Sequence, residues 1–207
     1  MTYTLFASKG CGSAIVEAMM AAARLPYQLE ELDFEELGPT SERLRELNPL
    51  GQVPTLKLPN GNVMTESAAI MLHINDQQPE LGLVPPQGDA NRDAFWRWQM
   101  FLISALYPTF AYGDEPSRWV SGPAIKELDH STLEHRKELW KYLEDQVLEG
   151  GWFLGKQFCA LDIYLSVMSR WRPRRPWFEA HCPKLLKIAV HADCYPGVSD
   201  VITRNFG

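Results

Sequence analysis

The chain has 207 residues, of which 45% are hydrophobic and 22% are charged, and its formal net charge is -6. An acidic chain of this ordinary composition does not suit a general binder of nucleic acids or of anionic membranes. No apolar run approaches the ~18 residues that a transmembrane helix needs. We therefore expect one or two globular domains, with no nucleic-acid partner and no membrane partner.

The cysteines and the N-terminal residues indicate a reducing compartment. The four cysteines are widely separated, with no CxxC pair and no spacing typical of metal ligands; they are Cys11, Cys159, Cys182 and Cys194. A strand-like stretch begins by Tyr3, so we expect no signal peptide. We expect reduced thiols, a cytoplasmic location and no bound metal.

The first part of the chain alternates between strand-like and helix-like segments. The expected order is strand 2–6, helix 14–24, strand 27–33, loop 35–39, helix 41–47, a strand from 53, strand 62–65 and a helix from 66. Asn60-Gly61 lies between two short apolar runs, a strong signal for a hairpin. This order predicts a mixed sheet with helices on both faces.

The second part of the chain is helical throughout. A stretch rich in Pro and Gly, 79–88, has no periodicity and is interpreted as a linker. Helical patterns follow at 90–106, 126–148, 160–171, 183–190 and 198–205, with a break at 116–122. The sequence therefore predicts an α/β domain over 1–78 and an all-helical domain over 89–207.

The most informative stretch lies around Pro54 and Glu66. Proline cannot donate to a sheet ladder, so Pro54 marks an edge or an irregular strand start. With a cis Val53-Pro54 bond, the main-chain groups of Val53 would face outward and pair with an extended peptide. The N–H groups at the start of a helix at Glu66-Ser67 attract a carboxylate, and Glu66 attracts an ammonium group. The stretch therefore predicts a binding site for a small peptide with a free amino-acid end.

The same residues carry a family resemblance. The pattern NPxGQVPxL, followed by [TS]-E-S-x-A-I, resembles the glutathione-binding half of the cytosolic glutathione S-transferases. The resemblance implies a thioredoxin-like domain, an all-helical second domain, a homodimer, and glutathione and a small electrophile as substrates. It also implies that glutathione is held by Gln52, Val53, Pro54, Glu66 and Ser67.

One family element is altered in this chain. Family members usually begin the buried helix of the second domain with S/T-x-x-D, an N-cap and its reciprocal partner. Here the run is Cys159-Ala160-Leu161-Asp162, and cysteine is a poorer cap than serine or threonine. Because losing a good cap costs ~1 kcal/mol, we expect the fold to tolerate this change.

The resemblance places the sulfur of glutathione near the loop 8–13, at the start of the first helix. An ordinary thiol has a pKa of ~8.5, and lowering it by about two units requires roughly 2.7 kcal/mol. A helix N-terminus supplies ~0.3–1 kcal/mol, and a hydrogen bond to a charged acceptor supplies ~1.5–3 kcal/mol. We therefore expect this loop to contain a donor directed at the sulfur.

Three residues are candidates for this catalytic role. Ser13, or a backbone N–H beside it, ranks first, because it corresponds to the serine after the active cysteine in the bacterial beta class. Cys11 ranks second, because it lies one place from that cysteine, whose position holds Gly12 here. Ser8 ranks third, on an S-x-x-C spacing seen in serine-type classes. The loop has no tyrosine, which disfavours a tyrosine-type mechanism, and the choice among the three stays open.

The second substrate is expected between the domains, in an apolar pocket on the helical side. The candidate lining residues are Tyr107, Phe110, Tyr112, Trp119 and Trp171. The basic run 170–175 is a candidate site for an anionic electrophile or for the carboxylates of glutathione. The expected function is a glutathione transferase. Two alternatives remain: a glutathione-dependent disulfide or peroxide reductase that uses Cys11, and a binding protein without catalysis.

Overall fold

The computed structural model describes residues 2–34, 37 and 41–207. The expected loop 35–39 lies, apart from residue 37, outside the described residues. The chain divides into two compact units. The first unit combines Met1–Pro86 with Val190–Gly207, and the second comprises Gln87–Ala189.

The first unit contains the mixed sheet that the sequence predicts. Its strands are β1 (Tyr3–Ala7), β2 (Tyr27–Glu31), β3 (Thr55–Lys57) and β4 (Val63–Met64). Its N-terminal helices are α1 (Ser13–Ala22), α2 (Glu42–Arg45) and α3 (Ser67–Gln77), and the 3₁₀ turn η3 (Pro79–Leu81) follows. The strand order is β2-β1-β3-β4, with β1 and β2 parallel and the other pairs antiparallel. This βαβαββα order confirms the thioredoxin-like fold.

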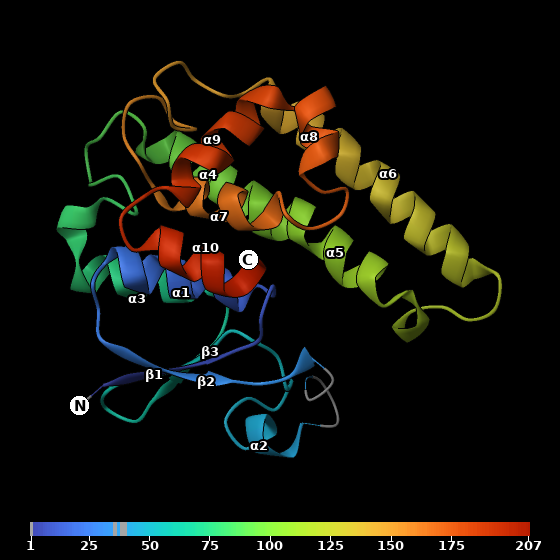
Figure 1. The fold of residues 1–207 in the computed structure, drawn as a ribbon, viewed down its shortest axis with the longest axis horizontal. Helices are drawn as coiled ribbons and strands as arrows, with labels where there is room; N and C mark the ends of the chain where they lie inside the picture. Colours follow the sequence, from blue (N-terminus) through green and yellow to red (C-terminus); the bar gives the residue numbers. More distant parts are fainter. Residues whose placement is uncertain (1, 35–36, 38–40) are drawn as a thin grey trace. The chain divides into compact units, whose positions relative to one another are not determined.

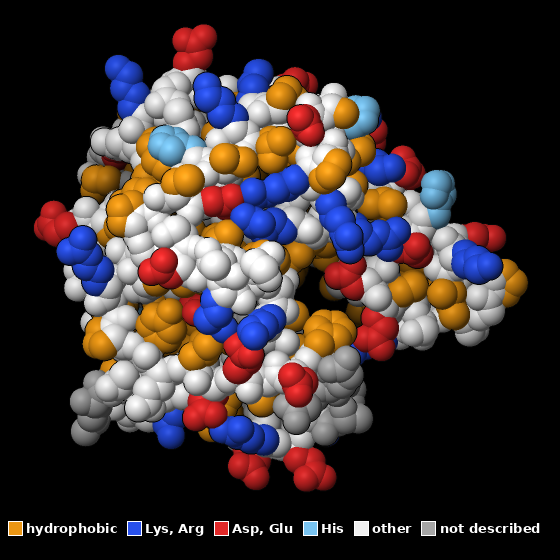
Figure 2. Space-filling view, viewed as in Figure 1, with side chains coloured by type: hydrophobic (Ala, Val, Ile, Leu, Met, Phe, Trp, Pro, Cys, Tyr) orange, Lys and Arg blue, Asp and Glu red, His pale blue; other side chains and the backbone are white. Residues whose placement is uncertain are grey.

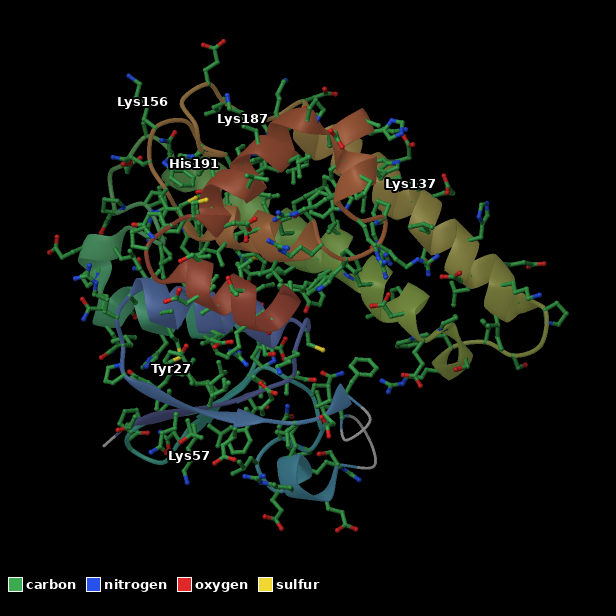
Figure 3. The ribbon with its side chains drawn as sticks, in the orientation of Figure 1. Tyr27, Lys57, Lys137, Lys156, Lys187 and His191 are labelled. Carbon is green, nitrogen blue, oxygen red and sulfur yellow. The ribbon has the colours of Figure 1, made fainter. Side chains whose placement is uncertain are left out.

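Helices cover both faces of this sheet. α1, α3 and the C-terminal helix α10 (Val198–Phe206) lie on one face, and α2 lies on the other (Figure 1). α1 is almost entirely buried, as expected for a helix that is apolar nearly all round. On the other face, Leu44 of α2 packs with Phe6 and Leu32, and Val53 lies against this cluster. Lys57 of β3 points away from α1 and α3 (Figure 3).

The β3–β4 hairpin is confirmed, but its turn differs from the two-residue type that Asn-Gly favours. The N–H of Gly61 donates to the carbonyl of Leu58 at 2.9 Å. The N–H of Leu58 donates to the carbonyl of Asn62 at 2.8 Å. Gly61 has a φ of 90°, in the left-handed region. The loop is therefore a three-residue connection that uses glycine at its left-handed position.

The second unit is helical. Its elements are α4 (Arg92–Phe101), η4 (Leu102–Leu106), α5 (Tyr107–Asp114), η5 (Pro116–Arg118), α6 (Ala124–Glu144), α7 (Ala160–Met168), α8 (Arg175–His181) and α9 (Pro183–Asp193), whose last residues are grouped with the first unit. Among the described residues, none of the helices has the length and apolar character required to span a membrane.

The sequence did not predict α5 and α8. Both have a proline in their first turn, where its missing N–H costs no hydrogen bond. η4 is a π-helical turn that joins α4 to α5. Pro108 has no N–H to donate to the carbonyl four residues earlier, which accounts for the widened turn just before it.

The buried helix α7 keeps its cap despite the cysteine. Cys159 is extended, with φ −149° and ψ 178°, and forms a capping box with Asp162. The carboxylate of Asp162 accepts hydrogen bonds from the N–H groups of Cys159 and Phe153, both at 2.8 Å. The expectation that the fold tolerates cysteine here is therefore consistent with the structure.

Candidate functional site

The segment before β3 is held by two side chains that the sequence did not single out. The Val53–Pro54 bond is cis. The amide of Asn48 and the hydroxyl of Thr55 both donate to the carbonyl of Gln52, at 3.0 and 2.8 Å. Asn48 and Thr55 are buried, whereas the side chain of Gln52 is exposed and Val53 and Pro54 are half-buried. The only sequence signal for Asn48 and Thr55 is that they are polar residues on either side of the turn, the second at the start of the strand.

This arrangement leaves a main-chain edge at Val53. Within the described residues, no hydrogen bond is formed by the N–H or the C=O of Val53. Because the carbonyl of Gln52 is held by Asn48 and Thr55, this edge is fixed at its N-terminal side. A short fixed edge of this kind can pair with an extended peptide as with one more strand.

The start of α3 offers the complementary features. Glu66 has φ 64° and ψ 108°, a left-handed conformation that is uncommon for a residue with a side chain. Its side chain is exposed and does not cap α3, the helix that begins at Ser67. The first N–H groups of a helix have no intrahelical acceptor and favour an anion. Strained conformations of this kind are concentrated at functional sites.

The sheet register brings these two features together. β3 and β4 pair Leu56 with Met64 and Lys57 with Val63. The strands are antiparallel and Leu56 pairs with Met64, so the start of β3 and the end of β4 lie at the same end of the pair. The peptide edge and the helix start therefore lie at the same end of the β3–β4 pair.

The loop Ser8–Ser13, called the thiol loop below, brings together the three catalytic candidates. The hydroxyl of Ser13 donates to the carbonyl of Ser8 and accepts from its N–H, both at 3.0 Å. Ser13 is 1% exposed and Ser8 3% exposed, whereas Cys11 is half-buried. The hydroxyl of Ser13 thus closes the loop, and Cys11 is the candidate whose side chain reaches solvent.

Main-chain groups at the start of α1 are further donors. The N–H groups of Ala14 and Ile15 donate to the carbonyls of Cys11 and Gly12, at 3.0 and 3.2 Å. For the N–H groups of Gly12 and Ser13, the described part of the chain supplies no acceptor. These two groups have the orientation of an anion site at a helix N-terminus.

The aromatic candidates divide into two groups in the helical unit. The ring of Trp171 lies 5.6 Å from Tyr107 and 5.0 Å from Phe110, so these three residues form one cluster. Tyr112 instead packs against Trp119, with ring centroids 4.8 Å apart. Phe110 is only 3% exposed, which makes it chiefly a core residue.

The cluster rests on Arg136, which the sequence did not predict. Its guanidinium lies 3.8 Å from the ring centroid of Phe110 and donates to the hydroxyl and carbonyl of Thr109 and to the carbonyl of Arg172. Burial lowers the pKa of Arg136 to about 10, although Asp114 acts in the opposite direction. Arg136 is therefore a buried cation with hydrogen bonds to neutral oxygens, stacked on an aromatic ring.

Part of the positive charge of the basic run 170–175 is paired with other groups of the protein. Lys and Arg side chains gather over the segment between α7 and α8 (Figure 2). Arg172 pairs with Asp129 at 2.7 Å, and Arg175 donates to the hydroxyl of Ser169 and the carbonyl of Ser166. In the part of the chain that the structure describes, no three His, Cys, Asp or Glu side chains are grouped to hold a metal ion.

Comparison with known proteins identifies the family. Residues 13–77 match the family model described as the N-terminal domain of glutathione S-transferases. The GST-like protein YncG of Escherichia coli K12, described as uncharacterized, is 38% identical over 197 residues, 95% of each chain. Glutathione S-transferase GST-4.5 of Xanthomonas campestris is 27% identical over 81% of each chain.

Solved structures of other proteins have the same fold over almost the whole chain. A glutathione transferase homologue from Sulfitobacter, with bound glutathione, superposes with a TM-score of 0.86 at 26% identity and covers 98% of each chain. A sphingomonad glutathione S-transferase complexed with glutathione gives a TM-score of 0.81 at 25% identity, also over 98% of each chain. The fold, the family model and the extended similarity to YncG together show that the chain belongs to the glutathione S-transferase family.

Proposed function

We propose that this protein is a glutathione transferase, which binds glutathione and transfers its sulfur to an electrophilic small molecule. The observation that carries the proposal is the main-chain edge at Val53, at the same end of the β3–β4 pair as the exposed Glu66 and the start of α3. Two structural relatives are described as containing glutathione.

The residues of the first unit suit the parts of the tripeptide. Glutathione carries a free amino-acid end, a peptide-like centre and a thiol. Glu66 would receive the ammonium group, and the N–H groups at Ser67 would receive the adjacent carboxylate. Val53 would pair with the main chain of the central residue, beside Pro54, and Gln52 would contact the peptide with its exposed amide.

The thiol loop would then stabilise the thiolate. The hydroxyl of Ser13 is already committed to Ser8, so we assign the contact with sulfur to the N–H groups at Gly12 and Ser13 and to the thiol of Cys11. The proton leaves the sulfur of glutathione for solvent. The thiolate next forms a sulfur–carbon bond with the electrophile, and either a leaving group departs with the bonding pair or the pair shifts onto an activated acceptor.

Titration calorimetry with glutathione tests the first step. For Glu66→Gln we expect the Kd for glutathione to rise about tenfold, because a charge-assisted contact of about 1.4 kcal/mol is lost. The thermal stability should not change, because Glu66 is exposed. Glu42→Gln, an exposed substitution on α2, serves as the control and should leave the Kd unchanged. Absence of binding by the wild-type protein at millimolar glutathione would contradict the proposal.

The reductase alternative is favoured by one observation, the solvent access of Cys11. In that reaction the thiolate of Cys11 attacks oxidised glutathione, forms a mixed disulfide and releases one reduced glutathione. Mass spectrometry after treatment with oxidised glutathione distinguishes the two functions. An adduct on Cys11, with activity lost in Cys11→Ala and kept in Ser13→Ala, would establish the reductase.

The remaining alternative, a binding protein without catalysis, makes a separate prediction. Such a protein binds glutathione in calorimetry but does not accelerate its reaction with an activated aryl chloride. The family resemblance also leads us to propose a homodimer in the cytoplasm. Light scattering at micromolar concentrations measures the mass directly, and a mass equal to that of one 23.6 kDa chain would contradict the dimer.

A further inference from the structure

The last turn of α10 contacts the thiol loop within the first unit. The side-chain oxygen of Asn205 accepts a hydrogen bond from the N–H of Gly10 at 3.3 Å. The ring of Phe206 packs against the same residue, since a Cβ added to Gly10 would lie 3.7 Å from it. α10 lies beside α1, whose N-terminus carries the loop (Figure 1). Residues almost 200 positions apart therefore meet at the proposed site of the sulfur.

A buried charge fixes the orientation of the Asn205 amide. Its nitrogen donates to the carboxylate of Glu17 at 3.1 Å and to the carbonyl of Val201 at 2.9 Å. Because a carboxylate and a carbonyl can only accept, the amide nitrogen must face them and the oxygen must face Gly10. The orientation of the amide is thus determined by its partners.

Glu17 is itself held in place from two further directions. It is 3% exposed and forms a two-point ion pair with Arg204, whose Nε lies 3.0 Å from its Oε1. Arg204 also contacts Glu31 at 2.6 Å. The hydroxyl of Tyr27, labelled in Figure 3, donates to Glu17 at 3.3 Å. The anchor of Asn205 is therefore a charged network that links α1, β2 and α10.

We propose that Asn205 is a positioning residue for the thiol loop; this inference rests on the proposed function. Gly10 has a φ of 71° and directly precedes Cys11. A hydrogen bond to its N–H fixes the Lys9–Gly10 peptide plane, which leads directly into Cys11 and Gly12. Donors stabilise a developing anion best when they are oriented before it forms, so a loosened loop stabilises the thiolate less.

The experiment measures the pKa of the thiol of bound glutathione, from the ultraviolet absorbance of the thiolate as a function of pH. Asn205→Leu in the full-length protein has nearly the same volume but no acceptor for Gly10. We expect this pKa to rise by about 0.5–1 unit, as loss of one oriented hydrogen bond implies. The Kd for glutathione should change less than about twofold, because the residues proposed to hold the peptide are elsewhere.

Arg204→Lys is the matched control on the same turn of α10. It weakens the two-point pair with Glu17 and lowers the melting temperature, but lysine keeps a cation beside Glu17, so the carboxylate that orients Asn205 and the acceptor for Gly10 are both retained. If Asn205 acted only through stability, both variants would shift the thiol pKa in proportion to their loss of melting temperature. Equal shifts, or a wild-type pKa in Asn205→Leu, would overturn the inference.

Hydrogen exchange measured without glutathione separates this inference from the proposed function. We expect faster exchange across the thiol loop in Asn205→Leu than in Arg204→Lys. Asn205→Ala repeats the measurement if the leucine does not fit. A wild-type protein that shows no glutathione thiolate contradicts the proposed function. Unchanged exchange in both Asn205 variants contradicts the positioning role, whatever the protein binds.

Discussion

Asn48 shows how one buried side chain sets the geometry of a site that it does not enter. Its amide donates both to the carbonyl of Gln52 and to the hydroxyl of Thr55, and its oxygen accepts from the N–H of Leu50. A buried amide left without these partners would cost about 1–3 kcal/mol, which is why the turn is held in one conformation. The neighbouring main chain at Val53 is thereby fixed before any ligand arrives.

Ser13 shows a different outcome. From the sequence, Ser13 or a backbone N–H beside it is the preferred donor to the sulfur of glutathione, and that role remains a prediction. In the structure, the hydroxyl both donates to and accepts from the main chain of Ser8. Serine hydroxyls readily bond to nearby backbone groups, and here the partner is a residue five positions earlier. The sequence shows that a hydroxyl is present at Ser13, but it does not show that the carbonyl of Ser8 competes with the sulfur for its hydrogen.

The cysteines differ in environment, and their reactivity should follow. Burial raises the pKa of Cys182 to about 12, and the carboxylate of Glu144 acts in the same direction. Burial also raises the pKa of Cys159, and so does Asp162. Because the thiolate is the nucleophile, the thiol of Cys182 should be almost unreactive at pH 8.

Alkylation with iodoacetamide at pH 8, read by mass spectrometry, measures this difference. We expect Cys194, which is exposed, and Cys11, which is half-buried, to react in the native protein. Cys159 and Cys182 should react only after unfolding in urea. Rapid native labelling of Cys182 would show that its environment is more polar than the structure indicates.

At the scale of elements, one carboxylate joins two helices. Glu144, at the end of α6, is buried and accepts hydrogen bonds from the N–H groups of Lys184 and Leu185, both at 2.9 Å. These are first-turn donors of α9, which have no partner within their own helix. A negative charge at this position also interacts favourably with the helix dipole. Glu144 therefore caps α9 from a residue 40 positions away.

Replacing this cap should destabilise the protein. For Glu144→Ala we expect the free energy of unfolding in urea to fall by about 2–3 kcal/mol, because a charged acceptor of two hydrogen bonds is lost. Glu144→Gln, which keeps one acceptor oxygen, should cost about half as much. The control is Glu138→Ala on the same helix, where the exposed pair with Lys141 contributes at most about 0.5 kcal/mol. Equal effects at both positions would contradict the capping role.

The elements that the sequence missed share a cause. α5 and α8 each contain a proline, and a proline within a pattern is usually interpreted as an interruption. In both helices it occupies the first turn, where a proline is compatible with the helix. Whether a proline ends a helix or begins one depends on the course of the chain just before the proline. Tertiary packing decides that course.

For the molecule as a whole, α10 completes the N-terminal unit. Val198, Val201 and Ile202 are buried, and Arg204 supplies the partner of the buried Glu17. Gly197, with φ 84°, approaches α1 so closely that a Cβ would lie 2.6 Å from the carbonyl oxygen of Ala21. The end of the chain is therefore part of the core of its first unit.

Arg204→Ala should reveal this dependence. The substitution leaves the carboxylate of Glu17 buried without its cation, and we expect the free energy of unfolding in urea to fall by about 3 kcal/mol. The double variant with Glu17→Gln should recover part of this loss, because the uncompensated charge is gone. Additive losses in the double variant would show that the two side chains act independently.

The sequence by itself determined the fold class and pointed to the segment that we propose as the peptide site. Periodicity gives the strands and most helices, and the residues from Asn48 to Ser67 lie close together in the chain, so their joint geometry follows from local rules. Only the tertiary structure decided which groups meet over long separations. Asn205 with Gly10, Arg204 with Glu17 and Glu144 with α9 depend on how the helices pack, and no local pattern records those contacts.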